Sequence, residues 1–319
     1  MDTTLTARPL TNGRYVIGLA TQADEAGLRR LLRETPMPGP IQITLEREPD
    51  FFAAAQQEGG RYYTAAIRDR QTGQLVAMGS RSVRKLFVNG HPRRIGYLSQ
   101  LRIAPEHRRH SRQFLRMGFD LLRQTHAEDE MPFDITTIVA DNEVARRLLE
   151  AGLPGLPRYT PVERILTMLL PVRGPASRAP SLPGTTGGAP ILQFAPVEIP
   201  CSGVWDQRMF KQIVVRGYSP WLRRCRWLWR LPAVGTVLPV AYWSCPSLTN
   251  DDLDAARAAA REKGCRWLAF GLSERHSLVD VVRRRYRPRV YKSILYVVHE
   301  PDTTVELDGR IAHVEVALL

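Results

Sequence analysis

Residues 97–113 read YLSQLRIAPEHRRHSRQ, a strand pattern that ends near a Pro-Glu pair and runs into a helix pattern. Where a loop enters a helix, free backbone N–H groups point at one spot and the helix dipole adds positive potential. Arg108, Arg109 and Arg112 would add charge-assisted hydrogen bonds to an anion at that spot. The stretch therefore predicts a phosphate-binding turn between a strand and a helix.

Segments on both sides of this stretch alternate between strand and helix patterns. Strands are predicted from their apolar runs and turn signals, and helices from apolar spacing and caps such as Thr21 with Asp24. The predicted strands are residues 14–20, 62–68, 75–83, 94–103, 133–140 and 164–170, and the predicted helices are 21–33, 48–57, 111–126 and 142–150. The order β-α-α-β-β-β-α-β-α-β indicates an α/β (α+β) fold with a mixed central sheet.

This order and the stretch 97–113 resemble the GNAT superfamily of acetyl-CoA-dependent N-acetyltransferases. The family has a strand ending in Leu-x-Val-x-Pro-Glu, then Arg-x-x-Gly-x-Gly or Gly-x-Ala, and later Asn-x-x-Ala at the start of a helix. The matching residues are Leu101, Ile103, Pro105, Glu106, Arg108, Asn142 and Ala145. The resemblance extends over residues 14–170 and implies a central sheet of the GNAT type.

The resemblance also implies a donor, acetyl-CoA or another acyl-CoA, and no metal. Strand addition to the pantetheine amides and anion binding at a helix N-terminus are the physical basis of such a donor site. The residues assigned to it are Leu101, Arg102, Ile103, Arg108, Arg109, His110, Ser111, Arg112, Gln113 and Asn142. We therefore expect the donor to lie along the strand, with its phosphates at the start of the helix.

Three positions depart from the family pattern. Ser111 and Gln113 replace two small residues, and Gln113 is bulky where the backbone must approach phosphate closely. Leu149 stands seven residues after Asn142, where the family has its general-acid tyrosine. Direct attack of an amine on a thioester can proceed without a dedicated acid, because positioning and oxyanion stabilisation supply much of the rate.

Tyr97, Ser99 and Tyr159 are the candidate catalytic residues. Tyr97 lies about where some family members carry a glutamate that deprotonates the amine. A phenol with a pKa near 10 is a poor base at neutral pH unless its pKa is shifted. Aromatic packing with a satisfied hydroxyl is the alternative interpretation of both tyrosines.

The second half of the chain follows a stretch with five prolines and four glycines, residues 171–190. We expect a tail at 1–13, a GNAT-like domain at 14–170, a linker at 171–190 and a second domain at 191–319. The predicted strands of the second domain are 212–215, 240–244, 266–272, 290–299 and 313–318, and its predicted helices are 249–263 and 278–286. This order weakly resembles a second, degenerate GNAT-like domain without a phosphate turn, which we interpret as non-catalytic.

Residues 221–230 read WLRRCRWLWR. As a helix, they would place Trp221, Cys225, Leu228 and Trp229 on one face and the arginines elsewhere. Arginine and tryptophan at this density suit peripheral contact with a membrane or an acidic acyl carrier protein. The alternative is a basic-rimmed helix that packs its tryptophans into the core.

Composition excludes several classes of protein. The 319 residues are 44% hydrophobic and 24% charged, which is typical of a globular protein. The formal charge is +13, but only four of the 45 basic residues are lysine, so we attribute the arginine bias to the coding genome and expect no nucleic-acid partner. The four widely spaced cysteines form no CxxC motif, which argues against zinc. Reduced thiols and the absence of a signal-peptide pattern predict a cytoplasmic location.

The sequence therefore predicts a two-domain N-acyltransferase of the GNAT kind that acts on the amine of a small molecule or peptide. An acyl-carrier-protein donor is the alternative among enzymes, and a catalytically silent acyl-thioester-binding module is the alternative outside them. Nothing in the sequence selects one acceptor. A homodimer remains open, because such domains often pair.

Overall fold

The computed structural model describes residues 8–58, 60–172, 192–197, 203–228, 231–244 and 250–318. The elements of the first half are β1 (Leu10–Asn12), β2 (Tyr15–Leu19), η1 (Gln22–Asp24), α1 (Glu25–Glu34), β3 (Ile41–Glu46), α2 (Phe51–Gln57), β4 (Arg61–Asp69), β5 (Leu75–Val88), β6 (His91–Ile103), η2 (Pro105–His110), α3 (Ser111–Arg123), β7 (Glu130–Val139), α4 (Glu143–Glu150) and β8 (Arg158–Pro171). The elements of the second half are β9 (Gly203–Asp206), β10 (Gln212–Tyr218), α5 (Pro220–Cys225), β11 (Val240–Ser244), α6 (Asn250–Glu262), β12 (Trp267–Ser273), α7 (Leu278–Tyr286), β13 (Arg289–His299) and η3 (Val316–Leu318).

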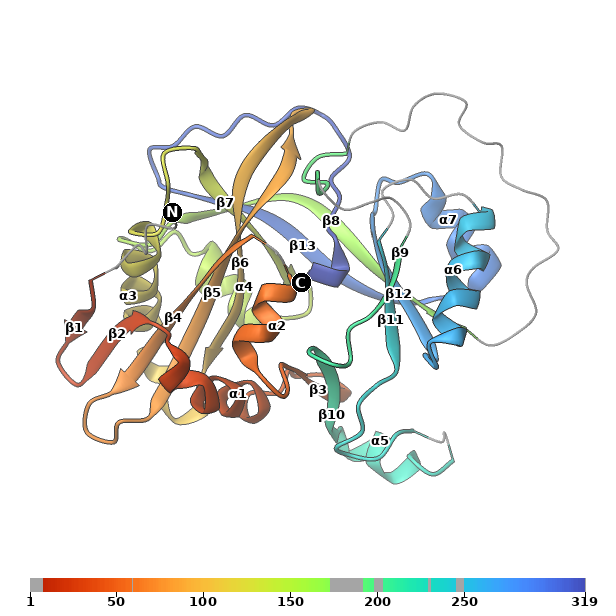
Figure 1. The fold of residues 1–319 in the computed structure, drawn as a ribbon, viewed down its shortest axis with the longest axis horizontal. Helices are drawn as coiled ribbons and strands as arrows, with labels where there is room; N and C mark the ends of the chain where they lie inside the picture. Colours follow the sequence, from red (N-terminus) through yellow and green to blue (C-terminus); the bar gives the residue numbers. More distant parts are fainter. Residues whose placement is uncertain are drawn as a thin grey trace.

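In the described part of the chain, strands from both halves form one mixed sheet of eleven strands (Figure 1). Its order is β1-β2-β4-β5-β6-β7-β13-β8-β12-β11-β9, and the β6–β7 and β11–β12 pairs are parallel. Strand β13, near the end of the chain, inserts between β7 and β8 and pairs with both. The second half therefore completes the sheet of the first. The domain limits stay a prediction, and residues 173–190 of the predicted linker lie outside the described residues.

Helices cover both faces of the first half of the sheet. Side chains alternate between faces along a strand, so Ala65 and Ile67 of β4 pack with α3 while Ala66 packs with α1. In the second half, α6 and α7 pack against β8, β11 and β12. Apolar residues recur at helical spacing in each of these helices, so they lie on one face, and that face is buried against the sheet.

A separate two-stranded sheet joins the halves at a second place. Strand β10 pairs antiparallel with β3, from Gln212 opposite Glu46 to Tyr218 opposite Ile41. The sequence analysis predicted no strand at β3, although IQITLE alternates apolar and polar residues. The partner of β3 lies about 170 residues away in sequence, a pairing that only the tertiary structure decides.

The prediction of a strand at residues 313–318 is wrong. Its residues are buried, but the end of the segment forms η3, and Val316 and Ala317 pack on Val240 and Ala269 of the sheet. A Cβ on Gly271 of β12 would lie 2.7 Å from the carbonyl oxygen of Val314. The segment thus crosses one face of the sheet, where the missing side chain of Gly271 leaves room for it. It does not add a strand to the edge of the sheet.

Candidate functional site

Strands β6 and β7 separate part-way along their length. Their parallel pairing includes Gly96 with Asp134 and Tyr97 with Ile135, and no later residue of either strand is paired across this boundary. Beyond Tyr97, β6 continues to Ile103 and remains paired only with β5. The edge of β6 that faces β7 is therefore open from about residue 98 to residue 103.

A buried ion cluster holds the two strands together just before they separate. The side chain of Arg81, from β5, lies across Gly96. It donates from Nε to Asp134 Oδ1 at 3.0 Å and from Nη2 to Glu130 Oε2 at 2.6 Å. A Cβ on Gly96 would lie 2.0 Å from Asp134 Oδ1, so only glycine leaves room for this contact. Burial opposes ionisation of Asp134, but His126 and Arg81 hold its pKa below the ordinary value.

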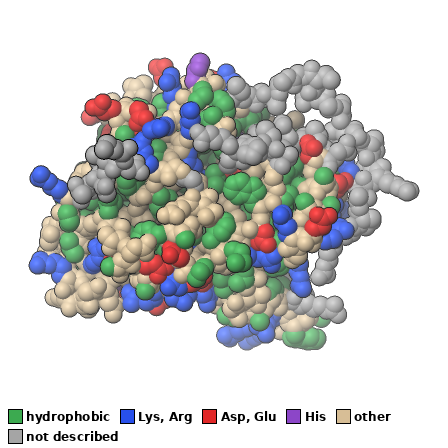
Figure 2. Space-filling model, in the orientation of Figure 1, with side chains coloured by type: hydrophobic (Ala, Val, Ile, Leu, Met, Phe, Trp, Pro, Cys, Tyr) green, Lys and Arg blue, Asp and Glu red, His purple; other side chains and the backbone are tan. Residues whose placement is uncertain are grey.

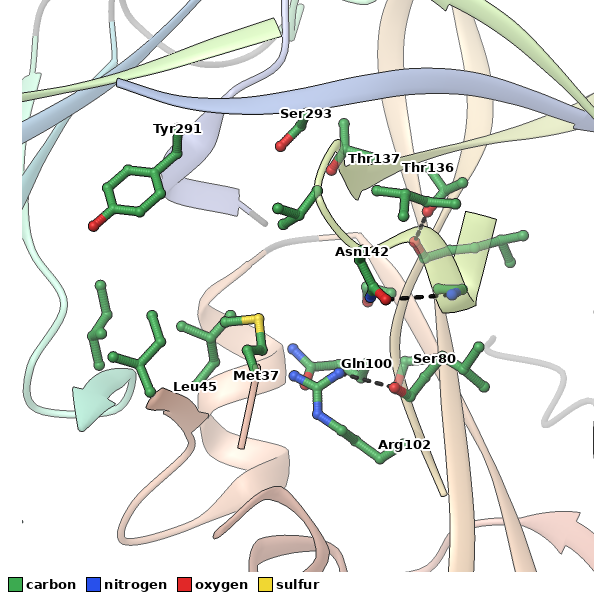
Figure 3. Close-up of a pocket in the computed structure, with 18 of the residues that line it drawn as sticks. Met37, Leu45, Ser80, Gln100, Arg102, Thr136, Thr137, Asn142, Tyr291 and Ser293 are labelled. Carbon is green, nitrogen blue, oxygen red and sulfur yellow. Dashed lines mark hydrogen bonds between the residues drawn. The ribbon is translucent and has the colours of Figure 1, made fainter. Parts of the chain in front are cut away.

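Two threonines of β7 fill the point of separation. Thr136 Oγ1 donates to the carbonyl of Leu98 at 2.8 Å (Figure 3). Thr137 Oγ1 is 2.6 Å from the hydroxyl of Tyr97. These side chains take the place of the backbone ladder that ends there. Beyond them, the described residues provide no strand partner for this edge of β6, so an extended ligand can pair with it.

A β-bulge re-aims the end of β6. Ser80 pairs with Ser99 and Met78 with Arg102, so Gly79 faces two residues, Gln100 and Leu101. Gln100 has φ +55°, a left-handed conformation that is unusual outside glycine. Bulges of this kind commonly occur beside functional sites, where they redirect side chains and backbone groups.

The open edge borders a cavity of about 970 Å³. On the α3 side, its apolar walls include Leu98, Phe114, Leu115, Phe119 and Leu122. On the β3–β10 side, they include Met37, Ile41, Ile43, Leu45 and Ile213. Because side chains from both halves line it, the cavity exists only in the assembled chain. Its size is at the upper end for a ligand pocket.

No protein-family model matches the sequence, and no curated protein matches it. Among solved structures, Saccharomyces cerevisiae N-myristoyltransferase with bound myristoyl-CoA is similar at 10% identity and TM-score 0.57, over 98% of this chain and 92% of that one. A second structure of the yeast enzyme matches at 11% identity and TM-score 0.55, over 96% and 86% of the chains. A GCN5-related N-acetyltransferase from Sphaerobacter thermophilus aligns at 12% identity and TM-score 0.48, over 94% and 100%.

The chain has a GNAT-type fold. N-myristoyltransferase has two tandem GNAT domains, and this chain resembles it over nearly its whole length. The fold class and the family resemblance predicted from the sequence are confirmed. The identities of 10–11% with the yeast enzyme establish the fold alone.

Four of the residues that the sequence analysis assigned to the donor line this cavity: Leu101, Arg102, Ile103 and Asn142. Leu101 is 41% exposed. Asn142 caps α4, and its Oδ1 accepts from the N–H of Ala145 at 3.3 Å (Figure 3). The Asn-x-x-Ala pattern thus has a local structural cause, a helix cap at the edge of the cavity.

The other assigned residues lie outside the cavity lining. Arg108, Arg109 and His110 end η2, and Ser111, Arg112 and Gln113 begin α3. A 3-10 helix, η2, replaces the expected loop and leads directly into α3. The hydroxyl of Ser111 donates to the carbonyl of Arg108 and does not cap a free N–H group. Arg108, Arg109 and Arg112 are exposed, which leaves them available to an anion.

The structure gives Tyr97 the environment of a packed aromatic residue. Burial raises the pKa of Tyr97 to about 12, although the hydrogen bond to Thr137 favours the ionised form. The guanidinium of Arg84 lies 5.8 Å from the centre of its ring. A phenol with this pKa is not a base at neutral pH, so any role of Tyr97 here is in positioning.

Ser99 and Tyr159 also line the cavity. The ring of Tyr159 packs edge-on against Phe119 and Tyr296, at centroid distances of 6.5 and 6.0 Å. Burial raises the pKa of Tyr159 well above its usual value. Leu149, at the position of the family tyrosine, is 7% exposed in an apolar cluster with Tyr296.

Sequence reasoning missed the part of the lining that comes from the second half, which includes the polar residues Lys211, Tyr291 and Ser293. Figure 3 shows Tyr291 and Ser293 on β13, on the same side of the cavity as Thr137. The strand containing Tyr291 and Ser293 was predicted, but its place between β7 and β8 was not. Local patterns carry no signal for such an insertion.

The segment 221–230 ends as a helix earlier than expected. Helix α5 spans Pro220–Cys225, and Trp229 and Arg230 lie outside the described residues. Trp227 is 79% exposed and Leu228 is 62% exposed. Basic and hydrophobic side chains meet at the lower tip of the molecule, where α5 lies (Figures 1 and 2).

In the described part of the chain, no group of three or more His, Cys, Asp or Glu side chains is placed to hold a metal ion. The same residues include no helix that is both long and apolar enough to cross a membrane. Cys225 and Cys265 are free thiols, and Cys201 and Cys245 fall outside the described residues.

Proposed function

We propose that this protein is an N-acyltransferase that moves an acyl group from an acyl-CoA thioester to an amine. One observation carries the proposal: the β6 edge left open by the separation of β6 from β7 borders a large apolar cavity. An extended pantetheine chain carries amide groups that can pair with this edge as an added strand would. The apolar walls can then receive the acyl chain.

The start of α3 supports a phosphate site for the donor. Arg108 and Arg109 in the last turn of η2 and Arg112 in the first turn of α3 are exposed, and they follow directly on the end of β6. Arginine binds phosphate through several charge-assisted hydrogen bonds. Gln113 is only partly buried, so its amide is free to donate to a phosphate oxygen.

The reaction joins the acceptor nitrogen to the thioester carbonyl carbon. The nitrogen attacks, the C–N bond forms and the C–S bond breaks, giving an amide and free coenzyme A thiol. The ammonium form of the acceptor loses two protons: one goes to the leaving sulfur and the other to water. Backbone N–H groups on the open edge of β6 stabilise the negative oxygen of the tetrahedral intermediate.

The acyl group that fits this cavity best is a long aliphatic chain. Aliphatic and aromatic side chains from both halves form most of its walls. Burial of each methylene stabilises a bound chain by about 0.8 kcal/mol. The yeast N-myristoyltransferase that shares this fold was solved with myristoyl-CoA, a donor of this kind.

Calorimetric titration with coenzyme A, acetyl-CoA and myristoyl-CoA tests the proposal. We expect micromolar binding that becomes tighter with chain length and weakens when Arg108 is replaced by alanine. Arg147, an exposed arginine on α4, provides the matched control, since its replacement should leave donor binding unchanged. Failure of all three ligands to bind at millimolar concentration would contradict the donor site.

A carrier-protein donor is the second candidate. The exposed Trp227 and Leu228 beside α5, with Arg223, Arg224 and Arg226, offer an apolar and basic surface to an acidic carrier. This candidate predicts transfer from acyl-carrier protein without transfer from acyl-CoA.

A silent thioester-binding module, favoured by Leu149, predicts donor binding without release of thiol from any donor.

A further inference from the structure

The cavity has a polar end where two side chains, Gln100 and Arg102, each bury one polar atom that has no partner among the described residues. Gln100 is 7% exposed and lines the cavity, and its Oε1 has no hydrogen-bond partner among the described residues. Arg102 lines the same cavity and donates to the carbonyl of Leu101 at 2.9 Å, while its Nε has no partner. Figure 3 shows both side chains reaching from β6 towards Met37.

Negative charge is scarce around these two residues. In the part of the chain that the structure describes, Arg47, Arg84 and Lys211 all form ion pairs with one carboxylate, Glu58, and Arg102 forms none. Burial, and after it the charge of Arg47, lowers the pKa of Arg102 to about 10. Arg102 as a whole is half-buried, but its Nε is buried without a partner, and a buried polar group of a cation is stabilised by a negatively charged acceptor. This end of the cavity is therefore suited to an anion.

The backbone holds Gln100 in this place. Its φ of +55° is a conformation that costs energy for a residue other than glycine, and the bulge opposite Gly79 maintains it. The side-chain oxygen of Gln100 is a hydrogen-bond acceptor, whereas Arg102 presents only donors. A ligand that satisfies both must carry a hydrogen-bond donor and an acceptor, and the positive charge of Arg102 favours an anionic acceptor.

We propose that this end of the cavity binds an acceptor amine that also carries a carboxylate, with the amine on Gln100 Oε1 and the carboxylate on Arg102. The inference rests on the acyl transfer proposed above and adds the acceptor class, the amino carboxylates. Met37 and Leu45 stand opposite these groups (Figure 3) and suit an aliphatic side chain. L-Leucine is therefore the first probe.

The test compares L-leucine with isoamylamine, which is leucine without its carboxylate, and with L-leucinamide. With one acyl-CoA donor held constant, we expect kcat/KM to be at least about tenfold higher for leucine than for either analogue. A ratio of this size corresponds to the loss of one hydrogen bond between charged groups. Replacing Arg102 with glutamine should bring the ratio of leucine to isoamylamine close to one. The control Arg108→Gln should weaken the donor and leave this ratio unchanged.

Several results would overturn the proposal. Equal use of leucine, leucinamide and isoamylamine by the unaltered protein would do so, and this comparison needs no variant to fold. An Arg102→Gln protein with a normal melting curve and an unchanged ratio would do so too. A preference for glutaryl-CoA over pentanoyl-CoA that disappears in Arg102→Gln would assign the carboxylate to the donor, contrary to the proposal.

A binding measurement separates this inference from the proposed function. Saturation-transfer NMR on the protein with coenzyme A should detect leucine more strongly than isoamylamine, and Arg102→Gln should remove the difference. Leucine binding without acyl transfer would refute the proposed function and keep the amino-carboxylate site. Transfer to isoamylamine alone would keep the function and refute the site.

Discussion

Gly118 offers the sharpest test of where the acyl chain lies. This glycine is in the interior of α3 and lines the cavity, and a Cβ placed on it would meet no atom within 4 Å. Glycine inside a helix costs about 1 kcal/mol relative to alanine. We infer that the position keeps room for ligand at the expense of helix stability, since the surrounding packing does not require a glycine.

Gly118→Leu should therefore stabilise the protein and exclude a long acyl chain. The leucine side chain adds four carbons to the cavity, which displaces about four methylenes worth about 0.8 kcal/mol each, or about 3 kcal/mol in total. That corresponds to a loss of roughly a hundredfold in affinity for myristoyl-CoA. Affinity for acetyl-CoA should change little, and the free energy of unfolding should rise by about 0.5–1 kcal/mol.

Calorimetry with acetyl-, octanoyl- and myristoyl-CoA, together with thermal unfolding, measures both effects. Gly118→Ala is the matched control: it gives the same gain in helix stability but fills only one carbon, so its affinity loss should stay within about fourfold. A Gly118→Leu protein that is folded and still binds myristoyl-CoA with unchanged affinity would show that the acyl chain lies elsewhere.

Three further predictions concern charge. Arg108→Ala should weaken coenzyme A binding about tenfold, and the loss should shrink at high salt, as calorimetry at two ionic strengths would show. Glu58→Gln should destabilise the fold by about 3–5 kcal/mol in urea unfolding, because it leaves three buried cations without their shared carboxylate. Burial, with the nearby Arg47 and Arg84, lowers the pKa of Lys211 to about 8, so the folded state binds fewer protons than the unfolded state between pH 8 and 10.5. The free energy of unfolding should therefore rise by about 3 kcal/mol between pH 8 and 10.5, and this rise should be absent from Lys211→Met. Equal slopes of unfolding free energy against pH in the two proteins would refute the assignment.

Much of the local structure was determined by the sequence alone. The strand that ends at Ile103, the helix that begins at Ser111 and the helix that ends at Glu150 follow from neighbouring residues, and all lie where predicted. Helix α7 and strand β11 match their predicted limits. Short-range hydrogen bonds and apolar spacing dictate such elements, because their partners are only a few residues away.

The cavity was decided by the tertiary structure. It requires β13 to insert between β7 and β8 and β10 to pair with β3. It also requires Arg81 to bind Asp134 across Gly96, just before β6 and β7 separate. Each of these contacts joins segments that are tens to hundreds of residues apart, so no local pattern specifies them. The unpartnered atoms Gln100 Oε1 and Arg102 Nε could be recognised only in the folded chain, because a missing partner is visible only when every neighbour is known.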